Sequence, residues 1–216
     1  GRFNPVTLKT LRSQNSRRRA ALAKLDTVAP SALSNEQNLD RLAFRTRLLR
    51  ECEEFDRGRH EMDPGGIDVV LGSLLKELQR GEDNPKRAAG NIRSLLGDTP
   101  RYLAQAARLI TRPERVWRSI MADSHKASDV FFDAVAGFLQ STRKQRSDAT
   151  LLTTANRACQ RYHDSVLAKP LAKPGSFAIG PAALQRRIRD ELGLDYTLGQ
   201  VEAVALSEID RVGELL

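Results

Sequence analysis

Short turns that contain proline or glycine divide this sequence into segments of helix length, and this punctuation constrains the fold more than any other feature. In most of them, a residue that can cap a helix stands just before proline. Proline suits the first helical turn because the N–H that it lacks has no partner there. These turns are Asn84-Pro85, Asp98-Thr99-Pro100, Thr111-Arg112-Pro113 and Gly180-Pro181. We therefore predict that a new helix begins at each of them.

Between the turns, apolar residues recur at the three- and four-residue spacing of an amphipathic helix. Ser34, with Gln37 three residues later, predicts a capped helix that runs to about Arg57. Its expected buried face is Leu39, Leu42, Ala43, Leu49, Cys52 and Phe55. The helix expected over residues 66–79 buries Ile67, Val70, Leu71, Leu74, Leu75 and Leu78. Further helices are expected over residues 5–25, 113–140, 148–167, 181–191 and 197–213. Thr197 is expected to cap the last of these, and Gly193 to follow the end of the helix before it.

The composition favours helices alone. The chain has 216 residues, of which 40% are hydrophobic and only 5% are aromatic, and its Val and Ile residues form no runs that resemble buried strands. We predict an all-α fold of about nine helices in a bundle-like antiparallel array with short connections. We expect a single helical domain over 1–216. It comprises a main array at 1–168, a Pro/Gly-rich loop at 169–181, and a C-terminal helix pair at 182–216 packed on that array.

The charge is basic, and part of the excess lies near the start. The formal net charge is +8, from 35 Lys and Arg residues against 27 Asp and Glu residues. The first 24 residues contain no acid but hold Arg2, Lys9, Arg12, Arg17, Arg18, Arg19 and Lys24. Such a run can bind phosphate groups, or it can be the solvated face of a helix. No stacking aromatic residues accompany it, so we favour the solvated face and expect no nucleic-acid partner.

The stretch RGRHEMDPGG, residues 57–66, resembles part of a zinc-peptidase motif. In His-Glu-x-x-His, two imidazoles lie one helical turn apart, with a glutamate beside them as base. After His60 and Glu61, the position of the second ligand is held by Pro64, which cannot bind a metal. We interpret the stretch as a helix end, a turn and a proline-assisted helix start. A site formed by His60, His125 and His163 would require three separate segments to converge.

No other motif predicts a complete active site. The sequence contains no Gly-x-Ser-x-Gly elbow, phosphate-binding loop or dinucleotide fingerprint, so we assign no catalytic and no metal residues. The acidic cluster ECEEFD, residues 51–56, is expected to pair with Arg47, Arg50 and Arg57 along a helix surface. Cys52 and Cys159 fit apolar helical patterns and are expected to be small buried hydrophobes, although one disulfide stays open.

The sequence gives no sign of a membrane-spanning segment and does not indicate a cellular compartment. No apolar run approaches the roughly 18 residues of a membrane span, so we expect no transmembrane segment. The first residue is Gly1 rather than Met, and the sequence assigns no compartment.

The order of the segments is similar to the N-terminal part of a bacterial family known as domain of unknown function 885. The segments that carry the resemblance begin with LDTVAPSALSNEQNLDRLAFRTRLLRECEEF (25–55) and DPGGIDVVLGSLLKEL (63–78). They continue with TPRYLAQAARLITRPERVW (99–117) and SFAIGPAALQRRIRDELGLDYTLGQVEAVALSEIDRV (176–212). The last of these resembles the family most closely. Each motif is mostly apolar spacing with Gly and Pro, and the order makes the resemblance more specific than any single motif.

The resemblance implies an uncharacterised relative of zinc-dependent hydrolases of the peptidase type. Members carry a His-Glu-x-x-x-Pro-Gly-His-type signature in a C-terminal half, which this sequence does not contain, so zinc is implied for full-length relatives and not for this chain. In a complete enzyme, the loop at Phe177, Ile179 and Gly180 is expected to line the substrate cleft. The alternative, which we favour, is that Phe177 and Ile179 pack in the core and Gly180 permits a turn.

These observations lead to two hypotheses of different classes. The first is a non-catalytic scaffold and substrate-cleft part of a zinc-hydrolase-like protein, with an exposed apolar face that docks the C-terminal catalytic half or a second copy of the chain. The alternative is a stand-alone basic helical binding module for nucleic acid or an acidic protein partner.

Overall fold

The computed structural model describes residues 2–214, without the side chain of Arg143, and within this range it contains helices and no strands. The all-α prediction is confirmed. A short 3-10 turn covers Pro30–Ala32. The α-helices are α1 (Leu8–Asp26), α2 (Asn35–Asp56), α3 (Arg59–Met62), α4 (Gly66–Arg80), α5 (Pro85–Leu109), α6 (Arg115–Arg143), α7 (Asp148–Leu167), α8 (Pro181–Leu192) and α9 (Leu198–Gly213).

The chain forms two compact units. Unit 1 combines Gly1–Ser16 with Glu54–Ser176, and unit 2 combines Arg17–Glu53 with Phe177–Leu216. This grouping differs from the predicted main array at 1–168, because most of α1 and α2 belongs with the C-terminal helices. The Pro/Gly loop lies at 168–180, between α7 and α8, close to its predicted position at 169–181. That the chain folds as one domain stays a prediction.

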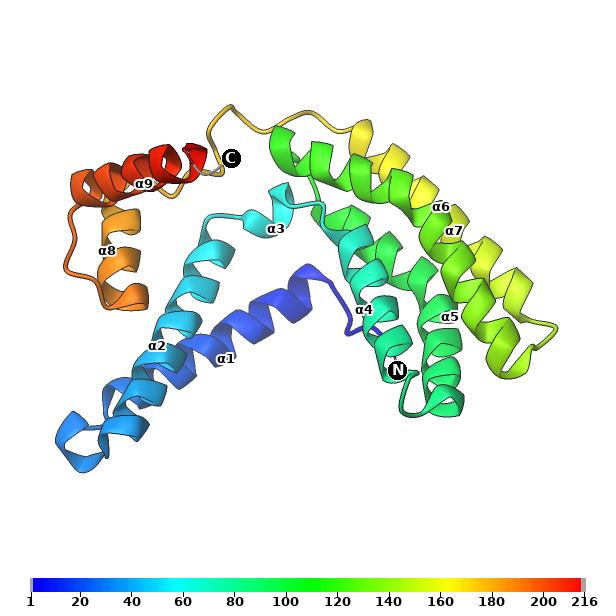
Figure 1. Ribbon diagram of the computed structural model, residues 1–216, viewed down its shortest axis with the longest axis horizontal. Helices are drawn as coiled ribbons and strands as arrows, with labels where there is room; N and C mark the ends of the chain where they lie inside the picture. Colours follow the sequence, from blue (N-terminus) through cyan, green and yellow to red (C-terminus); the bar gives the residue numbers. More distant parts are fainter. Residues whose placement is uncertain (1, 215–216) are drawn as a thin grey trace. The chain divides into compact units, whose positions relative to one another are not determined.

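The core of unit 1 lies among four long helices (Figure 1). Helix α5 packs against α4, α6 and α7, and α6 and α7 also pack against each other. The largest side chains buried almost completely there are Ile67, Val70 and Leu74 of α4, Ile92, Leu96 and Leu103 of α5, Met121, Val135 and Leu139 of α6, and Val166 of α7. The predicted α4 face is confirmed at its centre, whereas Leu75 is exposed.

The predicted helix start at Asp98-Thr99-Pro100 is wrong, because α5 continues through Pro100 without a break. Proline inside a helix removes one hydrogen bond and costs about 3 kcal/mol. Leu96 and Leu103 lie on either side of Pro100 and are both buried, and burial of each such side chain contributes roughly 1.5–3 kcal/mol. Core packing therefore outweighs the proline. Two predicted helices are thus joined into one. The four-residue helix α3, which was not predicted, makes up the difference in number.

The predicted caps are largely confirmed. The Asn84 side chain accepts a hydrogen bond from the backbone N–H of Arg87 at 3.1 Å. Thr197 and Gln200 form the reciprocal capping box at the start of α9, which satisfies two otherwise unpaired backbone donors. Gly193 follows α8 with φ 64°, in the left-handed region that glycine tolerates best.

The predicted buried face of α2 is partly wrong. Cys52 is buried, and so is Leu48, which was not predicted, but Leu39 and Leu42 are exposed. Within unit 2, hydrogen bonds and ion pairs join the second half of α2 to α8. Thr46 donates to the Asp190 carbonyl, and Arg50 and Glu53 form ion pairs with Glu191 and Arg186. The first half of α2 lies beyond these contacts, which explains its exposed leucines.

Two glycines of α4 offer a matched test of this packing. A Cβ atom added to Gly66 would lie 2.8 Å from Cζ of Tyr162, whereas one added to Gly72 would meet nothing within 4 Å. We expect Gly66→Ala to lower the free energy of unfolding by about 1–3 kcal/mol, because the buried Tyr162 ring must shift. Gly72→Ala is expected to raise it by roughly 0.5–1 kcal/mol through helix propensity. Urea unfolding followed by circular dichroism measures both, and a Gly66→Ala variant as stable as wild type would contradict the packing.

Candidate functional site

The RGRHEMDPGG stretch forms the turn that its sequence predicts. After α2, Gly58 adopts φ 70°, α3 follows as one helical turn, and Pro64 is buried just before α4. The His60 ring stacks on Phe55, with ring centroids 4.8 Å apart. Glu61 lies 3.3 Å from the Arg112 guanidinium, and its backbone carbonyl accepts the N–H of Arg112. His60 and Glu61 therefore have structural partners in this turn.

Two of the three histidines meet, but no metal site forms around them. The rings of His125 on α6 and His163 on α7 lie 4.5 Å apart. Nε2 of His125 lies 2.9 Å from the Gln160 amide oxygen, and Nδ1 of His163 lies 3.1 Å from Asp164. Within residues 2–214, no group of three or more His, Cys, Asp or Glu side chains could hold a metal ion. The convergence that a three-histidine site requires is thus not found there.

The loop expected to line a cleft leads into α8. Gly180 adopts φ 80° directly before Pro181, a conformation in which a side chain would be strained. Phe177 exposes 49% of its surface, so the favoured expectation that it packs in a core is wrong, and Ile179 is half-buried. A small groove in unit 2, between α2 and α8, is lined instead by Thr46, Leu49, Arg50, Glu53, Arg186, Arg187, Asp190 and Glu191. A cleft-lining role for Phe177, Ile179 and Gly180 stays a prediction.

Cys159 lacks the surroundings of a nucleophile. Both Cys52 and Cys159 are buried, as their apolar patterns predict. Burial, together with the nearby negative charge of Asp129, raises the pKa of Cys159 to about 12. Its thiol is therefore protonated at neutral pH, and the thiolate that attacks an electrophile is absent.

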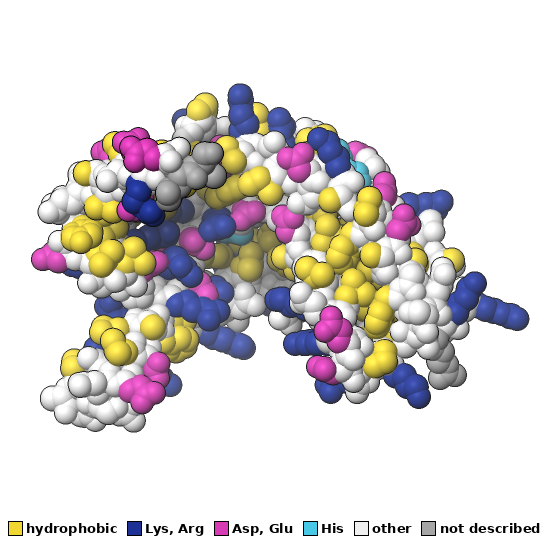
Figure 2. Space-filling model, viewed as in Figure 1, with side chains coloured by type: hydrophobic (Ala, Val, Ile, Leu, Met, Phe, Trp, Pro, Cys, Tyr) yellow, Lys and Arg dark blue, Asp and Glu magenta, His cyan; other side chains and the backbone are white. Residues whose placement is uncertain are grey.

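Many of the arginines are paired with carboxylates, so these cations do not form an uninterrupted basic surface. Figure 2 shows acidic side chains interspersed among the basic ones on the face in view. Arg47 pairs with Glu51 as predicted, whereas Arg50 pairs with Glu191. Arg18, from the basic run of α1, also contacts Glu51 at 2.6 Å. Other pairs join Arg45 to Asp26, Arg59 to Glu54 and Asp63, Arg80 to Glu77, Arg93 to Asp148, Arg101 to Asp98, and Arg186 to Glu53.

An apolar surface lies on the last two helices. None of the described residues of α9 is buried, although half of the helix is apolar. Leu206, Ile209 and Val212 follow one another at three-residue spacing and therefore lie along one side of α9. Figure 2 shows hydrophobic side chains gathered over the α8 and α9 pair. The exposed members from this region are Leu184, Leu192, Leu194, Tyr196, Val204, Leu206, Ile209 and Val212.

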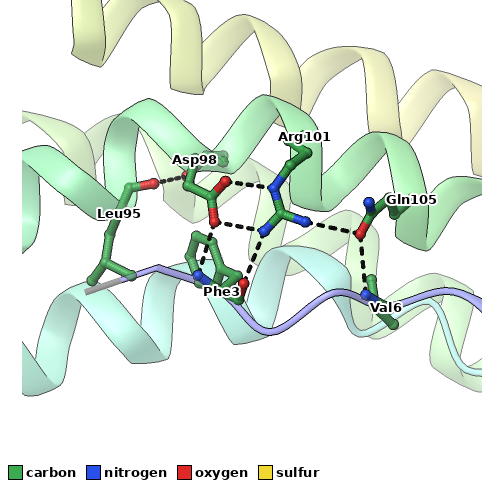
Figure 3. Close-up of polar contacts among 7 residues, drawn as sticks. Phe3, Val6, Leu95, Asp98, Arg101 and Gln105 are labelled. Atoms are coloured by element: carbon green, nitrogen blue, oxygen red, sulfur yellow. Dashed lines mark hydrogen bonds and ion pairs between the residues drawn. The ribbon is translucent and has the colours of Figure 1, made fainter. Parts of the chain in front are cut away.

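The sequence analysis missed a further set of contacts, made by residues 2–6, which we call the N-terminal strap (Figure 3). The Phe3 N–H donates to Asp98 of α5 at 2.9 Å, and the Val6 N–H donates to Gln105 at 3.1 Å. Arg101 donates to the Phe3 carbonyl at 2.8 Å. The only sequence signal was an aromatic residue close to Pro5 in a polar stretch, which is too weak to predict an anchor.

Comparison with known proteins adds no relative. No protein-family model, no curated protein and no solved structure matches this chain. Within the described residues, no helix is long and apolar enough to span a bilayer. The helices, the paired charges and the exposed apolar side of α9 are therefore the features on which a functional proposal rests.

The ion pair between Arg93 and Asp148 gives a test of charge pairing in unit 1. Both side chains are mostly buried, and the guanidinium contacts the carboxylate at 2.7 and 3.0 Å. The hydrogen bonds from Arg93 lower the pKa of Asp148, although burial opposes them; the Gln145 N–H adds to the lowering. The pair's contribution to stability is therefore complete above the unfolded-state pKa of about 3.9 and is lost as the pH falls through the folded-state pKa.

We expect Asp148→Asn to lower the free energy of unfolding by about 2–3 kcal/mol at pH 7, because it leaves Arg93 without its charge partner. The difference from wild type should shrink as the pH falls below about 4. Urea unfolding between pH 3 and pH 7 measures it. Asp123→Asn is the matched control, since its exposed pair with Lys126 is worth less than about 1 kcal/mol. Equal effects of the two substitutions at pH 7 would refute the assignment.

Proposed function

We propose that this chain is a non-catalytic helical scaffold that forms part of the substrate cleft of a zinc-dependent, peptidase-like hydrolase. In this proposal, the zinc ligands belong to the catalytic half that the family resemblance implies. The observation that carries the proposal is the exposed apolar side of α9, formed by Leu206, Ile209 and Val212. The loop at Phe177 and Ile179, which leads into α8, is the part of the chain proposed to face the substrate.

The exposure of α9 supports a docking role for physical reasons. Helical stability in proteins comes mainly from packing of an apolar face, and isolated helices shorter than about 12–15 residues, a length that α9 barely exceeds, are marginal in water. Helix α9 has 16 residues and buries none of those described. Its capping box contributes about 1 kcal/mol, which is too little to replace a packed face. A protein surface that covers this side of α9 would supply the missing stabilisation.

The pairing of charges supports this proposal over the alternative of a basic module for nucleic acid or an acidic partner. Binding to a phosphate backbone requires cationic side chains that face the nucleic acid and displace the counterions condensed on its phosphates. Arg18, Arg45 and Arg50 of unit 2 are each engaged by a carboxylate of the same unit. A nucleic acid would have to break these pairs, whereas an apolar partner surface would leave them intact.

The assignment of zinc chemistry to another segment makes a prediction about the chain alone. We expect the purified protein, after incubation with zinc and dialysis, to retain far less than one zinc ion per chain and to hydrolyse no peptide substrate. The reason is that the described residues assemble no set of three donor side chains. Elemental analysis measures the bound zinc, and a fluorogenic peptide assay measures hydrolysis. His163→Ala is the control, and it should give the same values as wild type. Stoichiometric zinc together with turnover would overturn the proposal.

The exposed side of α9 makes a prediction about self-association. At high concentration the chain is expected to dimerise through this surface, because burial of apolar area favours association. Ile209→Glu should shift sedimentation velocity profiles to the monomer. Val130→Glu, at an equally exposed apolar position on α6, should leave the dimer unchanged. Profiles in which both substitutions act alike, or in which wild type stays monomeric, would contradict this prediction.

A further inference from the structure

The N-terminal strap contacts α5 in the way that an extended peptide contacts a receptor. Its three long-range hydrogen bonds all run between strap backbone groups and α5 side chains. Asp98 accepts from the Phe3 N–H, Arg101 donates to the Phe3 carbonyl, and Gln105 accepts from the Val6 N–H. Figure 3 shows these three side chains in a row along α5, facing the strap. Recognition through main-chain groups fixes an extended conformation and leaves specificity to side-chain pockets.

The side chains of the row also bind one another, through contacts that do not involve the strap. Arg101 contacts Asp98 through two hydrogen bonds of 2.6 and 2.7 Å, and also donates to Gln105 at 3.1 Å. Asp98, Arg101 and Gln105 follow one another at three- and four-residue spacing, so all three lie on one side of α5. The polar part of the surface is therefore preorganised, which reduces the entropy lost when a peptide binds.

A pocket beside the polar row receives one aromatic side chain. The Phe3 ring stacks on Tyr102, with ring centroids 4.6 Å apart, and only 7% of Phe3 is exposed. Val69, Ser73 and Leu95 line the groove around the same ring. Val6 packs against the core at the far end of the strap. Between them, Pro5 fixes its own φ and disfavours helical conformation at the residue before it, which keeps the strap extended.

We propose that this side of α5 is a peptide-binding site for an extended Phe-x-x-Val segment, occupied in cis by the strap and open in trans to the strap of a second copy of the chain. The second copy is the occupant because it carries the identical segment, which fits both the polar row and the aromatic pocket. The strap is anchored at Phe3 and Val6, whereas Arg2, Asn4 and Pro5 are exposed, so it is a short terminal segment of the kind that can open locally without global unfolding. This inference does not depend on the proposed scaffold function.

A synthetic peptide of residues 2–7, labelled with a fluorophore, tests the site by fluorescence anisotropy on the full chain. The strap of wild type competes with the peptide at an effective concentration on the order of millimolar, so binding should be weak. Phe3→Ala removes the aromatic anchor of the strap, and this variant should bind the peptide at least about tenfold more tightly. Adding Arg101→Ala should abolish binding, and so should replacing Phe by Ala in the peptide.

A second variant keeps the test informative if Phe3→Ala does not fold. Pro5→Gly leaves Phe3 and the core intact but makes the extended strap less favoured, so it should also bind the peptide more tightly than wild type. Circular dichroism and thermal unfolding establish that each variant is folded. If neither folded variant binds the peptide at millimolar concentration, the strap is only a structural part of unit 1 and the proposal is overturned. Tighter binding that survives Arg101→Ala would overturn it as well.

Discussion

The packing of α5 against α4, α6 and α7 is the interaction on which unit 1 depends. Its buried leucines keep the helix continuous through Pro100, although proline normally ends or bends a helix at such a position. The same helix carries Arg93, which binds Asp148 at the start of α7, and the row of polar side chains that holds the N-terminal strap. Core, ion pair and strap are thus positioned by one element.

The sequence predicted the features that short-range interactions determine, and it missed those that depend on residues far apart in the chain. The caps at Asn84 and Thr197 and the turn after Gly193 follow from short-range hydrogen bonds, and they were found. Continuation through Pro100 depends on neighbouring helices, and so does the exposure of the first half of α2. The row at Asp98 could not be recognised because its ligand, Phe3, lies far away in the sequence.

The two polypeptide-binding surfaces that we propose rest on apolar and main-chain contacts rather than on metal or thiol chemistry. Within the described residues, the potential metal donors do not assemble, and the thiol of Cys159 is held in its protonated form. Many of the arginines pair with carboxylates of the same unit, so basic and acidic side chains lie side by side, while the net charge of +8 is unchanged by the pairing. The apolar side of α9 and the peptide-like strap contacts are two separate surfaces, in different units, suited to binding polypeptides.

The discontinuity of unit 2 has a consequence for how the chain folds. Unit 1 is built mainly from helices that follow one another, so its contacts are local and need little loop closure. Unit 2 joins residues 17–53 to residues 177–216, and all of residues 54–176 intervene. The closure entropy of that long loop is lost before the joining contacts form. During synthesis, the second half of α2 must therefore wait for α8 before Thr46, Arg50 and Glu53 can make their contacts.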